Sequence, residues 1–555
     1  MLKKNDIIET SITAMSSDGN GIAKAEGFVI FVPCSAVGDV VRLRIVKVQK
    51  SFAYGKIEEL LSPSANRIPP DCPVYQKCGG CSFRHISYQT ELRHKAEFVY
   101  SNLKRLGGFE PPMAPIVGSP QERCYRNKAQ YPVRQEGGKV IAGFFAKRSH
   151  RVIPCPRCAL QPAFFEDIVV YTCRFMEEKG VSAYEEEEGR GLVRHIYIRY
   201  GEISGEVMVC LVINGPSLPH AQQYIDGLLL VCPQVVSVIL NKNTRRDNVI
   251  LGEDCSTIYG KGAISDVLCG VTFEISPLSF YQVNRSAAQQ LYEIAARLAQ
   301  LKGNELLVDL YCGAGTIGLS MAGKVRQLIG VEIVPDAVEN ARANAQNCGI
   351  ENARFICSDA GTAAVTLAQE GLSPDVVVVD PPRKGCSAEV LQALRDMAPP
   401  KIVMISCNSA SLARDCKELL ACGYTVVQAV PVDLFPRTAH VETVVLLSHK
   451  TPDGHINVKV EFGEGEGKVP LDNIAKRAAA YKPKERVTYK MIKEYIEAKY
   501  GFKVHTAYIA EVKRDLGLPM YDAPNAVEEL KQPRKHPTPE KVEAIKDALK
   551  HFEVI

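Results

Sequence analysis

Short runs of alternating hydrophobic and polar residues fill the first 62 positions of the chain. Four of these runs have the period of a strand: DIIETSITAM, GFVIFVP, VVRLRIVKV and FAYGKIEEL. Several short strands in so small a segment predict a closed barrel, because closure leaves no strand edge unpaired. The lysines in the second half of this barrel fit either a solvated face or an RNA-binding one.

The pattern changes at about residue 266. Apolar strands such as ELLVDLYC, DVVVVD and KIVMISC then alternate with amphipathic helices such as DAVENARANAQNCG and SAEVLQALRDM. This alternation predicts a mostly parallel sheet with helices on both faces. Since such sheets bind their ligands at the carboxyl ends of the strands, we expect the chemistry of residues 266–450 at that edge.

Two further regions complete the predicted domain organisation. Residues 63–265 include the stretch TELRHKAEFVYSNLKRLGG, which predicts a helix over about 88–107 that packs on the parallel sheet. Residues 451–555 carry two helix-like runs joined near Gly501 and predict a small, mostly helical appendage. Docking, solubility and RNA binding are all open for it. The fold class is therefore multidomain α/β.

The composition is typical of a folded protein. The chain has 555 residues, 46% of them hydrophobic and 23% charged, so it is too long for one core and too apolar for disorder. Its net charge of +4 is too small to identify a nucleic-acid binder. No run approaches the ~20 apolar residues that span a bilayer, and no export signal is present. We therefore expect a cytoplasmic protein with no membrane partner and with reduced cysteines.

Three of the 19 cysteines are clustered. Cys72, Cys78 and Cys81 have the spacing C-x5-C-x2-C, and two glycines allow a tight turn between the last two. Thiols so close together indicate a metal site, whose fourth ligand is either Cys155 or Cys158 in IPCPRCALQ. Zinc accepts four cysteines too, but the uneven spacing and distant fourth ligand favour an iron–sulfur cluster.

Basic and aromatic residues interleave after this cluster. RCYRNKAQYPVR contains Arg126, Lys128 and Arg134 with Tyr125 and Tyr131, and FFAKRSHRVIP continues the pattern. Single-stranded nucleic acid needs cations for its phosphates and rings for its bases, so these segments are candidates for RNA binding. Ordinary strands with a solvated face are the alternative.

A glycine-rich turn marks a candidate cofactor site. In DLYCGAGTIG, Gly313, Gly315 and Gly318 have the spacing G-x-G-x-x-G, and Glu332 ends the next strand, where an acid that binds ribose belongs. The motif is weak alone, because every α/β nucleotide site needs such glycines, and a nicotinamide dinucleotide would also fit it.

Three aspartates at strand ends favour S-adenosylmethionine over a dinucleotide. Asp309 precedes the glycine-rich loop, where a carboxylate attracts the positive end of a methionine-derived ligand and repels a pyrophosphate. Asp359, in CSDA, can accept from an adenine amino group, and Asp380 begins DPPRKG, whose prolines suit a flat base. For each aspartate alone, a loop turn or a helix cap is the alternative.

A thiol follows the strand KIVMIS. Cys407 lies in a polar turn at the edge where the cofactor is expected, so we interpret it as a reactive thiol. A thiol beside a methyl donor suits a weakly nucleophilic acceptor such as carbon 5 of uracil, because its addition to carbon 6 makes carbon 5 electron-rich. A base must then remove the proton of carbon 5. Glu442 is the candidate, with His440 as its rival.

Taken together, these residues resemble the 23S rRNA (uracil-5-)-methyltransferase family over residues 5–448. The resemblance implies an OB-like, RNA-binding TRAM domain (1–62), a central RNA-binding domain with an iron–sulfur cluster (63–265) and a Rossmann-like class I methyltransferase domain (266–450), leaving the extension 451–555 without a function. It also implies which cysteines are the ligands of a [4Fe–4S] cluster: Cys72, Cys78, Cys81 and Cys155, but not Cys158.

The family's site residues carry over to matching positions. The resemblance implies that Gln282, Tyr311, Glu332 and Asp380 contact S-adenosylmethionine, that Cys407 is the nucleophile and that Glu442 is the base. The family usually follows its nucleophile with Asn, Pro and Thr, whereas here Asn408 is followed by SAS. We expect the missing proline to loosen this turn.

The sequence thus predicts a monomeric enzyme that flips a uridine out of folded 23S rRNA and methylates its carbon 5. Transfer RNA is the alternative substrate, since only the resemblance of the cysteine segment favours ribosomal RNA. An RNA-binding protein with an inactive methyltransferase fold is the alternative from another class. Because the reaction has no redox step, we expect the cluster to hold the RNA-binding domain together.

Overall fold

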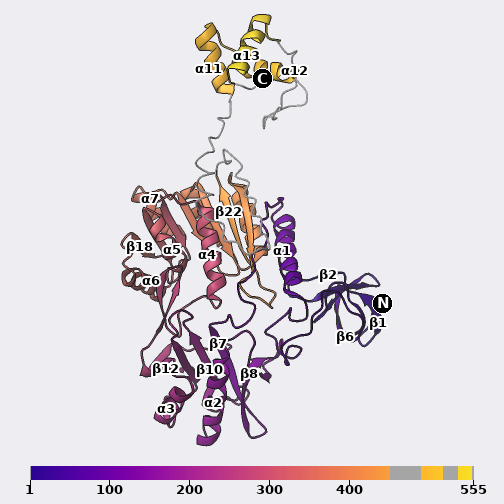
Figure 1. Cartoon of the computed structure of the whole chain (residues 1–555), viewed down its shortest axis with the longest axis vertical. Helices are drawn as coiled ribbons and strands as arrows, with labels where there is room; N and C mark the ends of the chain where they lie inside the picture. Colours follow the sequence, from indigo (N-terminus) through magenta and orange to yellow (C-terminus); the bar gives the residue numbers. More distant parts are fainter. Residues whose placement is uncertain (1, 450–488, 517–535, 553–555) are drawn as a thin grey trace, which may run out of the picture. The chain divides into compact units, whose positions relative to one another are not determined.

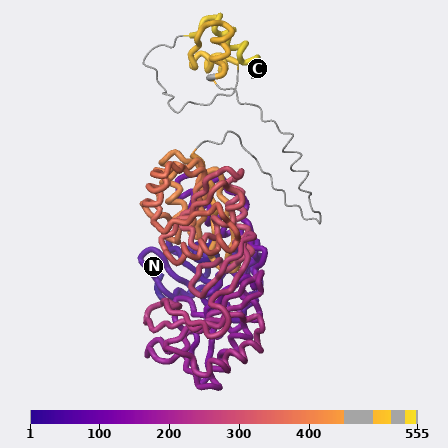
Figure 2. The backbone as a smooth tube through the Cα atoms, turned by 90° about the vertical axis from the view of Figure 1, so that its left-hand side faces the viewer, coloured from indigo at the N-terminus to yellow at the C-terminus, as the bar shows by residue number. Residues whose placement is uncertain are grey.

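The computed structural model describes residues 2–449, 489–516 and 536–552 (Figure 1). The chain forms two compact units, Met1–His455 and Ile456–Ile555 (Figure 2). The first unit contains three sheets of six or seven strands and one short hairpin.

The N-terminal sheet is a small barrel. Its six strands have the order β1-β5-β6-β4-β3-β2, and only Ile12 and Thr13 separate the edge strands β1 and β2, so the sheet must curl on itself. Ile30, Leu43 and Ile45 fill the interior. The strands are Ile7–Ser11 (β1), Ala14–Met15 (β2), Gly21–Ala25 (β3), Phe28–Val32 (β4), Val40–Val48 (β5) and Phe52–Ser62 (β6). The predicted barrel is confirmed.

The central sheet has the strand order β13-β12-β11-β10-β7-β8-β9. Helices α2 (Phe164–Lys179) and α3 (Ala221–Val231) contribute Phe165 and Leu228 to the core on one face. On the other face, Tyr197 and Met208 join the core that lies under the third large sheet. The strands are Lys128–Glu136 (β7), Lys139–Phe145 (β8), Val152–Pro154 (β9), Val193–Tyr200 (β10), Val207–Ile213 (β11), Val235–Lys242 (β12) and Asp254–Gly260 (β13).

The third large sheet has the order β18-β17-β16-β19-β20-β22-β21 and is parallel except for β22. Its apolar strands are buried on both faces, as expected of a sheet between two helix layers. The strands are Leu306–Leu310 (β16), Gln327–Glu332 (β17), Ala353–Cys357 (β18), Val376–Val379 (β19), Lys401–Ser406 (β20), Thr425–Val432 (β21) and Glu442–Ser448 (β22). The predicted Rossmann-like sheet is confirmed.

Helices cover both faces of this sheet. One face packs on α4 (Arg285–Ala299), α5 (Thr316–Met321) and α6 (Pro335–Asn347), and the hairpin of β14 (Ile264–Leu268) and β15 (Val271–Ile275) adds to the same core. The other face packs on α7 (Ala360–Gln369), α8 (Ala388–Met397) and α9 (Ser409–Leu420). The short 3-10 helix η1 spans Ala322–Lys324.

Helix α1 (Tyr88–Arg105) joins the second of these layers although it precedes the sheet by 200 residues in the chain. Ser87 caps it by accepting from Thr90 N, and Val99 and Leu103 enter the core. The helix also carries a buried ammonium group: Lys95 Nζ lies 2.7 Å from both Glu91 Oε1 and Asp433 Oδ1.

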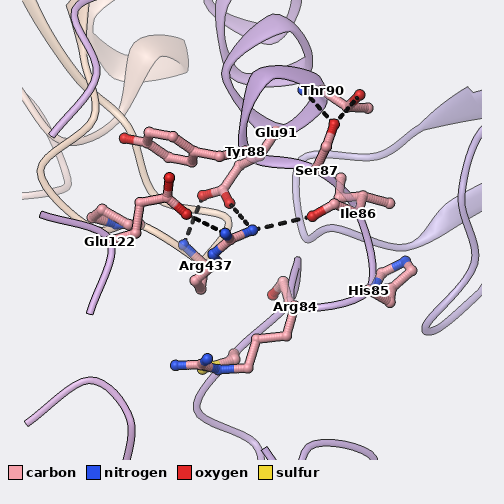
Figure 3. A network of polar contacts seen from close by, with 12 residues as sticks. Arg84, His85, Ile86, Ser87, Tyr88, Thr90, Glu91, Glu122 and Arg437 are labelled. Carbon is pink, nitrogen blue, oxygen red and sulfur yellow. Dashed lines mark hydrogen bonds and ion pairs between the residues drawn. The ribbon is translucent and has the colours of Figure 1, made fainter. Parts of the chain in front are cut away.

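The same buried cluster holds the loop that leads into β22. Arg437 N donates to Glu91 Oε1 at 2.7 Å, and the Arg437 guanidinium contacts Glu91, Glu122 and the carbonyl of Ile86 (Figure 3). Charges taken out of water are tolerated only when each has partners of opposite charge and good hydrogen bonds. The cluster therefore fixes the start of β22 relative to α1.

The described part of the second unit consists of three helices, α11 (Tyr489–Tyr500), α12 (Thr506–Asp515) and α13 (Pro539–His551). Ile496, Ile509 and Ala548 form its core. Residues 451–488, 517–535 and 553–555 of the predicted appendage lie outside the described residues. Within the described ranges, each helix is too short or too polar to traverse a lipid bilayer.

Removal of the buried ammonium group should destabilise the first unit. In Lys95→Met the carboxylates of Glu91 and Asp433 remain buried without their shared cation, which we expect to lower the free energy of unfolding by about 3–5 kcal/mol. Calorimetry of the full chain measures the shift in melting temperature. The control is Lys104→Met on the exposed side of the same helix, which should melt like the unmodified chain. Equal melting temperatures of the two variants would contradict a role for the cluster.

Candidate active site

Cys407 lies at the carboxyl end of β20, as predicted. It is partly buried in the turn between β20 and α9, and the next residue, Asn408, caps α9 by accepting from Ala410 N at 3.1 Å. The turn places the thiol beside the loop that follows β19, because β19 and β20 are parallel neighbours.

Hydrogen bonds join this turn to the DPPRKG loop. Asn408 Nδ2 and Ser411 Oγ both donate to the carbonyl of Arg383, at 3.0 and 3.2 Å. Ser411 Oγ also lies 3.0 Å from the carbonyl of Asn408. The turn expected to be loose without proline is thus tied to the neighbouring loop by a serine hydroxyl.

A buried carboxylate fixes the end of the same loop. Asp415, in α9, accepts from Cys386 N at 2.8 Å and pairs with Arg414. Gly385, at φ +83°, passes so close that a Cβ there would meet Asp415 Oδ2 at 2.5 Å, so only glycine fits. The DPPRKG loop and α9 therefore form one rigid support for Cys407.

Glu442 comes next to Cys407 because of strand register. Ser406 pairs with Thr443 in the antiparallel ladder of β20 and β22, so the residues one step beyond, Cys407 and Glu442, are neighbours at the end of the sheet. The Glu442 side chain is buried, 7% exposed. Burial, together with Asp380, raises the pKa of Glu442 to about 8, while Arg383 opposes this shift.

The thiol has the same charged neighbours. Burial and the carboxylates of Glu442 and Asp380 raise the pKa of Cys407, whereas Arg383, which hydrogen-bonds to it, lowers the pKa. Arg383 is therefore the cation that favours the thiolate. Arg383 was not among the predicted site residues, although its position three residues after Asp380 in DPPRKG was a usable signal.

His440, the rival base, lies beside the ring of Phe435, with 6.0 Å between ring centroids. Burial and the cations Arg383 and Lys95 lower the pKa of His440, so its ring is neutral at physiological pH. Its pKa makes it a weaker base than Glu442, whose pKa is raised.

The glycine-rich loop has the geometry of a nucleotide site. Glu332, at the end of β17, accepts from Gly313 N at 3.2 Å and from the backbone N–H groups of Ile333 and Val334. Gly313 has φ +53°, and Tyr311 adopts the left-handed region at φ +64° without being a glycine. A left-handed tyrosine is uncommon and indicates that the loop holds the ring in a fixed position.

The three aspartates have different surroundings. Asp380 is partly buried, and burial raises its pKa to about 7. Asp309 is fully buried in β16, where Oδ2 accepts from Gly318 N at 2.8 Å and Oδ1 has no hydrogen-bond partner. Asp359 is exposed and caps α7 by accepting from Thr362 N and Oγ1. A helix cap was one of the alternatives for Asp359, whereas Asp309 lies in a strand and forms neither a loop turn nor a helix cap.

Gln282 lies in the segment that connects β15 to α4. Its carbonyl accepts from Asn127 Nδ2 at 2.9 Å, and its side chain contacts the hydroxyl of Tyr292. The Tyr292 hydroxyl in turn lies 3.3 Å from Thr316 Oγ1 in α5. It is also close enough to Asp380 for that carboxylate to raise the pKa of Tyr292. Gln282 is thus on the same side of the sheet as Asp380 and the first helix of the nucleotide loop.

The predicted metal ligands line one cavity of about 80 Å³ in the N-terminal half of the chain. Its wall contains five cysteines together with Arg84 and Arg126: Cys72, Cys78, Cys81, Cys155 and Cys158. In the part of the chain that the structure describes, no three His, Cys, Asp or Glu side chains form a site for a single metal ion. A cluster differs from a single ion in that it binds each thiolate through a separate iron atom, so thiols spread around a cavity suit it.

Two guanidinium groups face these thiols. Arg84, 2% exposed, donates from Nε to Cys81 Sγ at 3.3 Å, and Arg126 Nε is buried without a hydrogen-bond partner. A cluster held by four thiolates carries negative charge, which these cations would offset. The donor set therefore fits an iron–sulfur cluster.

Two family models match this chain. One, described as tRNA (Uracil-5-)-methyltransferase, covers residues 87–450, and the other, the TRAM domain, covers residues 2–57. An uncharacterized RNA methyltransferase of Clostridium tetani is 41% identical over 448 residues, which are 81% of this chain and 97% of the relative. Another, from Halalkalibacterium halodurans, is 38% identical over 450 residues, 81% of this chain and 98% of the relative.

A solved structure has the same fold. The tRNA (uracil-54, C5)-methyltransferase of Pyrococcus abyssi, in complex with S-adenosyl-L-homocysteine, is 27% identical to this chain. It superposes with a TM-score of 0.64 and covers 79% of this chain and 100% of its own.

Removing the charge of Glu442 and removing the charge of Arg383 should change the reactivity of Cys407 in opposite directions. At about pH 9, where Glu442 is ionised, Glu442→Gln removes a negative charge and should speed alkylation of Cys407 by iodoacetamide, whereas Arg383→Met should slow it. A change of one pKa unit alters the thiolate fraction about tenfold, so we expect several-fold effects. Mass spectrometry of the Cys407 peptide measures the rate. Below about pH 7, where Glu442 is protonated, the effect of Glu442→Gln should disappear. Equal rates in all three proteins would exclude this electrostatic arrangement.

Proposed function

The chain belongs to the tRNA (uracil-5-)-methyltransferase family and carries a TRAM domain. We propose that it methylates carbon 5 of a specific uridine, and that this uridine lies in 23S ribosomal RNA. The main support for this proposal is the group of Cys407, Arg383, Asp380 and Glu442 at one end of the sheet. It combines a nucleophile, a cation that favours its ionised form and a buried carboxylate base.

The methyl donor is S-adenosylmethionine. The relative from Pyrococcus abyssi holds S-adenosyl-L-homocysteine, the product left after methyl transfer. Here Gly313, Glu332 and Tyr311 would hold the nucleoside part, with Asp359 toward the adenine. Asp380 and Gln282 would lie toward the methionine part, and Asp309 would support the loop from below. The donor supplies a methyl group on a positively charged sulfur, and nearby carboxylates attract that charge.

The chemistry begins with the Cys407 thiolate. Its sulfur forms a bond to carbon 6 of the flipped uracil, and the displaced ring electrons move onto the carbonyl oxygen at carbon 4. Carbon 5 of this enolate then takes the methyl group, and the donor leaves as S-adenosylhomocysteine. Carbon 5 now carries both a hydrogen and a methyl group, and sulfur remains bonded to carbon 6.

Glu442 completes the reaction as the base. Its carboxylate removes the proton from carbon 5, the electrons re-form the double bond between carbons 5 and 6, and the Cys407 sulfur leaves as a thiolate. A raised pKa makes the ionised Glu442 a stronger base, while Arg383 keeps part of it ionised near neutral pH. Arg383 thus lowers the pKa of the Cys407 thiol, which acts first, and of the Glu442 carboxyl group, which acts last.

Two RNA classes compete as the substrate. The cysteine segment favours ribosomal RNA through the resemblance in sequence, whereas the solved relative acts on transfer RNA. We take ribosomal RNA as the proposal and transfer RNA as the second candidate. Methyl transfer to transcripts of each, followed by mapping of 5-methyluridine, distinguishes them.

The proposal includes a [4Fe–4S] cluster in the cysteine cavity. Cys72, Cys78, Cys81 and Cys155 would be its ligands, with Arg84 and Arg126 offsetting its charge. When bound, the cluster supplies cross-links between the loop at 72–81 and the end of β9, and no step of methyl transfer needs it.

Blocking the last step should trap the reaction. In Glu442→Gln the proton of carbon 5 has no base, so we expect a covalent complex of protein and RNA that accumulates with S-adenosylmethionine and survives denaturation. Denaturing gel electrophoresis with labelled 23S rRNA or tRNA transcripts detects it. Cys407→Ala is the matched control, which should form no complex and show no turnover while binding the donor unchanged. A complex in the Cys407→Ala variant, or loss of donor binding there, would argue against the nucleophile.

The cavity offers a paired test of the ligand set. Cys155→Ser should lose bound iron and acid-labile sulfide after anaerobic purification, whereas Cys158→Ser should keep both and the visible absorption of the cluster. Chemical analysis of iron and sulfide per chain gives the answer independently of activity. The reverse result would make Cys158 the ligand, and iron-free unmodified protein after reconstitution would exclude the cluster.

A further inference from the structure

Two cations face each other across neighbouring strands of the central sheet. Lys128, the first residue of β7, is the direct antiparallel partner of Arg199 in β10. Arg199 is 4% exposed and Lys128 is partly buried. Like charges directly opposite each other on a sheet are destabilising, and burial increases the cost. The pair therefore calls for an explanation.

Among the described residues, no carboxylate is a hydrogen-bond partner of Arg199 or acts on the charge of Lys128. The Arg199 guanidinium donates to neutral acceptors only, namely the Tyr197 hydroxyl and the carbonyls of Pro277 and Ser279. Lys128 has two charged neighbours that act on its pKa, and both are cations. Burial, then Arg199 and Arg126, lower the pKa of Lys128 to about 8. Lys128 and Arg199 thus lack a compensating anion among their described contacts, and Arg126, the third cation, also lines the cysteine cavity.

These cations border the candidate active site. Asn127, between Arg126 and Lys128, donates from its backbone N to Val283 O and from Nδ2 to Gln282 O, both at 2.9 Å. Arg199 holds the segment Pro277–Ser279, which leads directly to Gln282. Arg126 also lines the cysteine cavity. The positive cluster therefore lies on the substrate side of the proposed methyl-transfer site.

We propose that Lys128, supported by Arg199 and Arg126, binds a backbone phosphate of the RNA next to the flipped uridine. A phosphate would supply the negative charge that the pair lacks, and RNA is the polyanion that must approach Gln282 and Cys407. A flipped nucleotide needs its neighbouring phosphates held, since base pairing no longer positions it. The proposal rests on the proposed function in one respect, that RNA is the substrate at this site.

The carboxylate of the methionine-derived donor is the other anion that could reach Gln282. A phosphate is the better match, because Lys128 and Arg199 belong to the central sheet, outside the strand ends that surround the nucleotide loop. The two sources differ in what the loss of Lys128 would weaken: RNA binding or donor binding.

Salt dependence of RNA binding tests the phosphate contact. For the full-length protein and a 23S rRNA transcript, loss of one phosphate contact in Lys128→Gln should reduce the slope of log K against log[KCl] by about 0.7 and weaken binding about tenfold at low salt. Lys128→Arg should restore both, since it keeps the charge. Lys139→Gln is the control, because Lys139 is exposed at the start of β8 and should leave binding unchanged.

Thermal stability provides an independent readout. Neutralising Lys128 removes its repulsion from Arg199, so Lys128→Gln should melt at a temperature equal to or above that of the unmodified protein while binding RNA more weakly. A lysine with only a structural role would instead lose stability on substitution. Lower stability with an unchanged salt slope would overturn the proposal.

Donor binding completes the test. Lys128→Gln should bind S-adenosylmethionine as the unmodified protein does, measured by calorimetry. Weaker donor binding with an unchanged RNA slope would assign the cations to the donor carboxylate and overturn the phosphate site. A further outcome is that the unmodified protein methylates neither the 23S rRNA nor the tRNA transcript while Lys128→Gln still reduces the salt slope of RNA binding. In that case the proposed function fails and the phosphate contact stands.

Discussion

The ammonium group of Lys95, buried between the carboxylates of Glu91 and Asp433, connects two parts of the chain that are more than 330 residues apart. On one side of it is the first long helix, and on the other is the loop that ends at β22. Glu91 also accepts from the backbone of Arg437, so the loop is held at two points. Because β22 begins with Glu442, the position of the proposed base depends on this ion cluster as well as on the strand register.

The candidate site separates its charges into two regions. Asp309, Asp380 and Glu442 gather at the strand ends, and burial raises the pKa of each. Burial favours the protonated forms of these carboxyl groups, Arg383 offsets it only in part at Glu442, and a positively charged sulfonium would compensate them further. Lys128 and Arg199, on neighbouring strands of the central sheet, have no carboxylate among their described contacts, and Arg126 lies two residues before Lys128. One region therefore suits a cationic donor and the other an anionic polymer, which are the two substrates of an RNA methyltransferase.

Local patterns in the sequence were sufficient for the sheet, the glycine-rich loop and the thiol at the end of β20, because strand ends and tight turns depend on neighbouring residues. They were insufficient for charges that meet only after folding. Lys128 and Arg199 are 71 positions apart, and their pairing depends on the order of β7 and β10. Asp433, which shares the ammonium group of Lys95 with Glu91, is likewise distant from both in the chain. Asp359 shows the converse, since its local sequence was compatible with a helix cap, which the structure shows, and with a ligand contact, which stays a prediction.

The turn after Cys407 shows how a local departure from a family pattern can be compensated through tertiary contacts. A proline after Asn408 would restrict the backbone through its ring. Here Ser411 instead bonds to the carbonyls of Asn408 and Arg383, and Asn408 bonds to Arg383 as well. These bonds restrict the turn and, unlike a proline, also fix the backbone of the residue whose guanidinium contacts the thiol. The serine therefore couples the position of the nucleophile to the position of the cation that favours its ionisation.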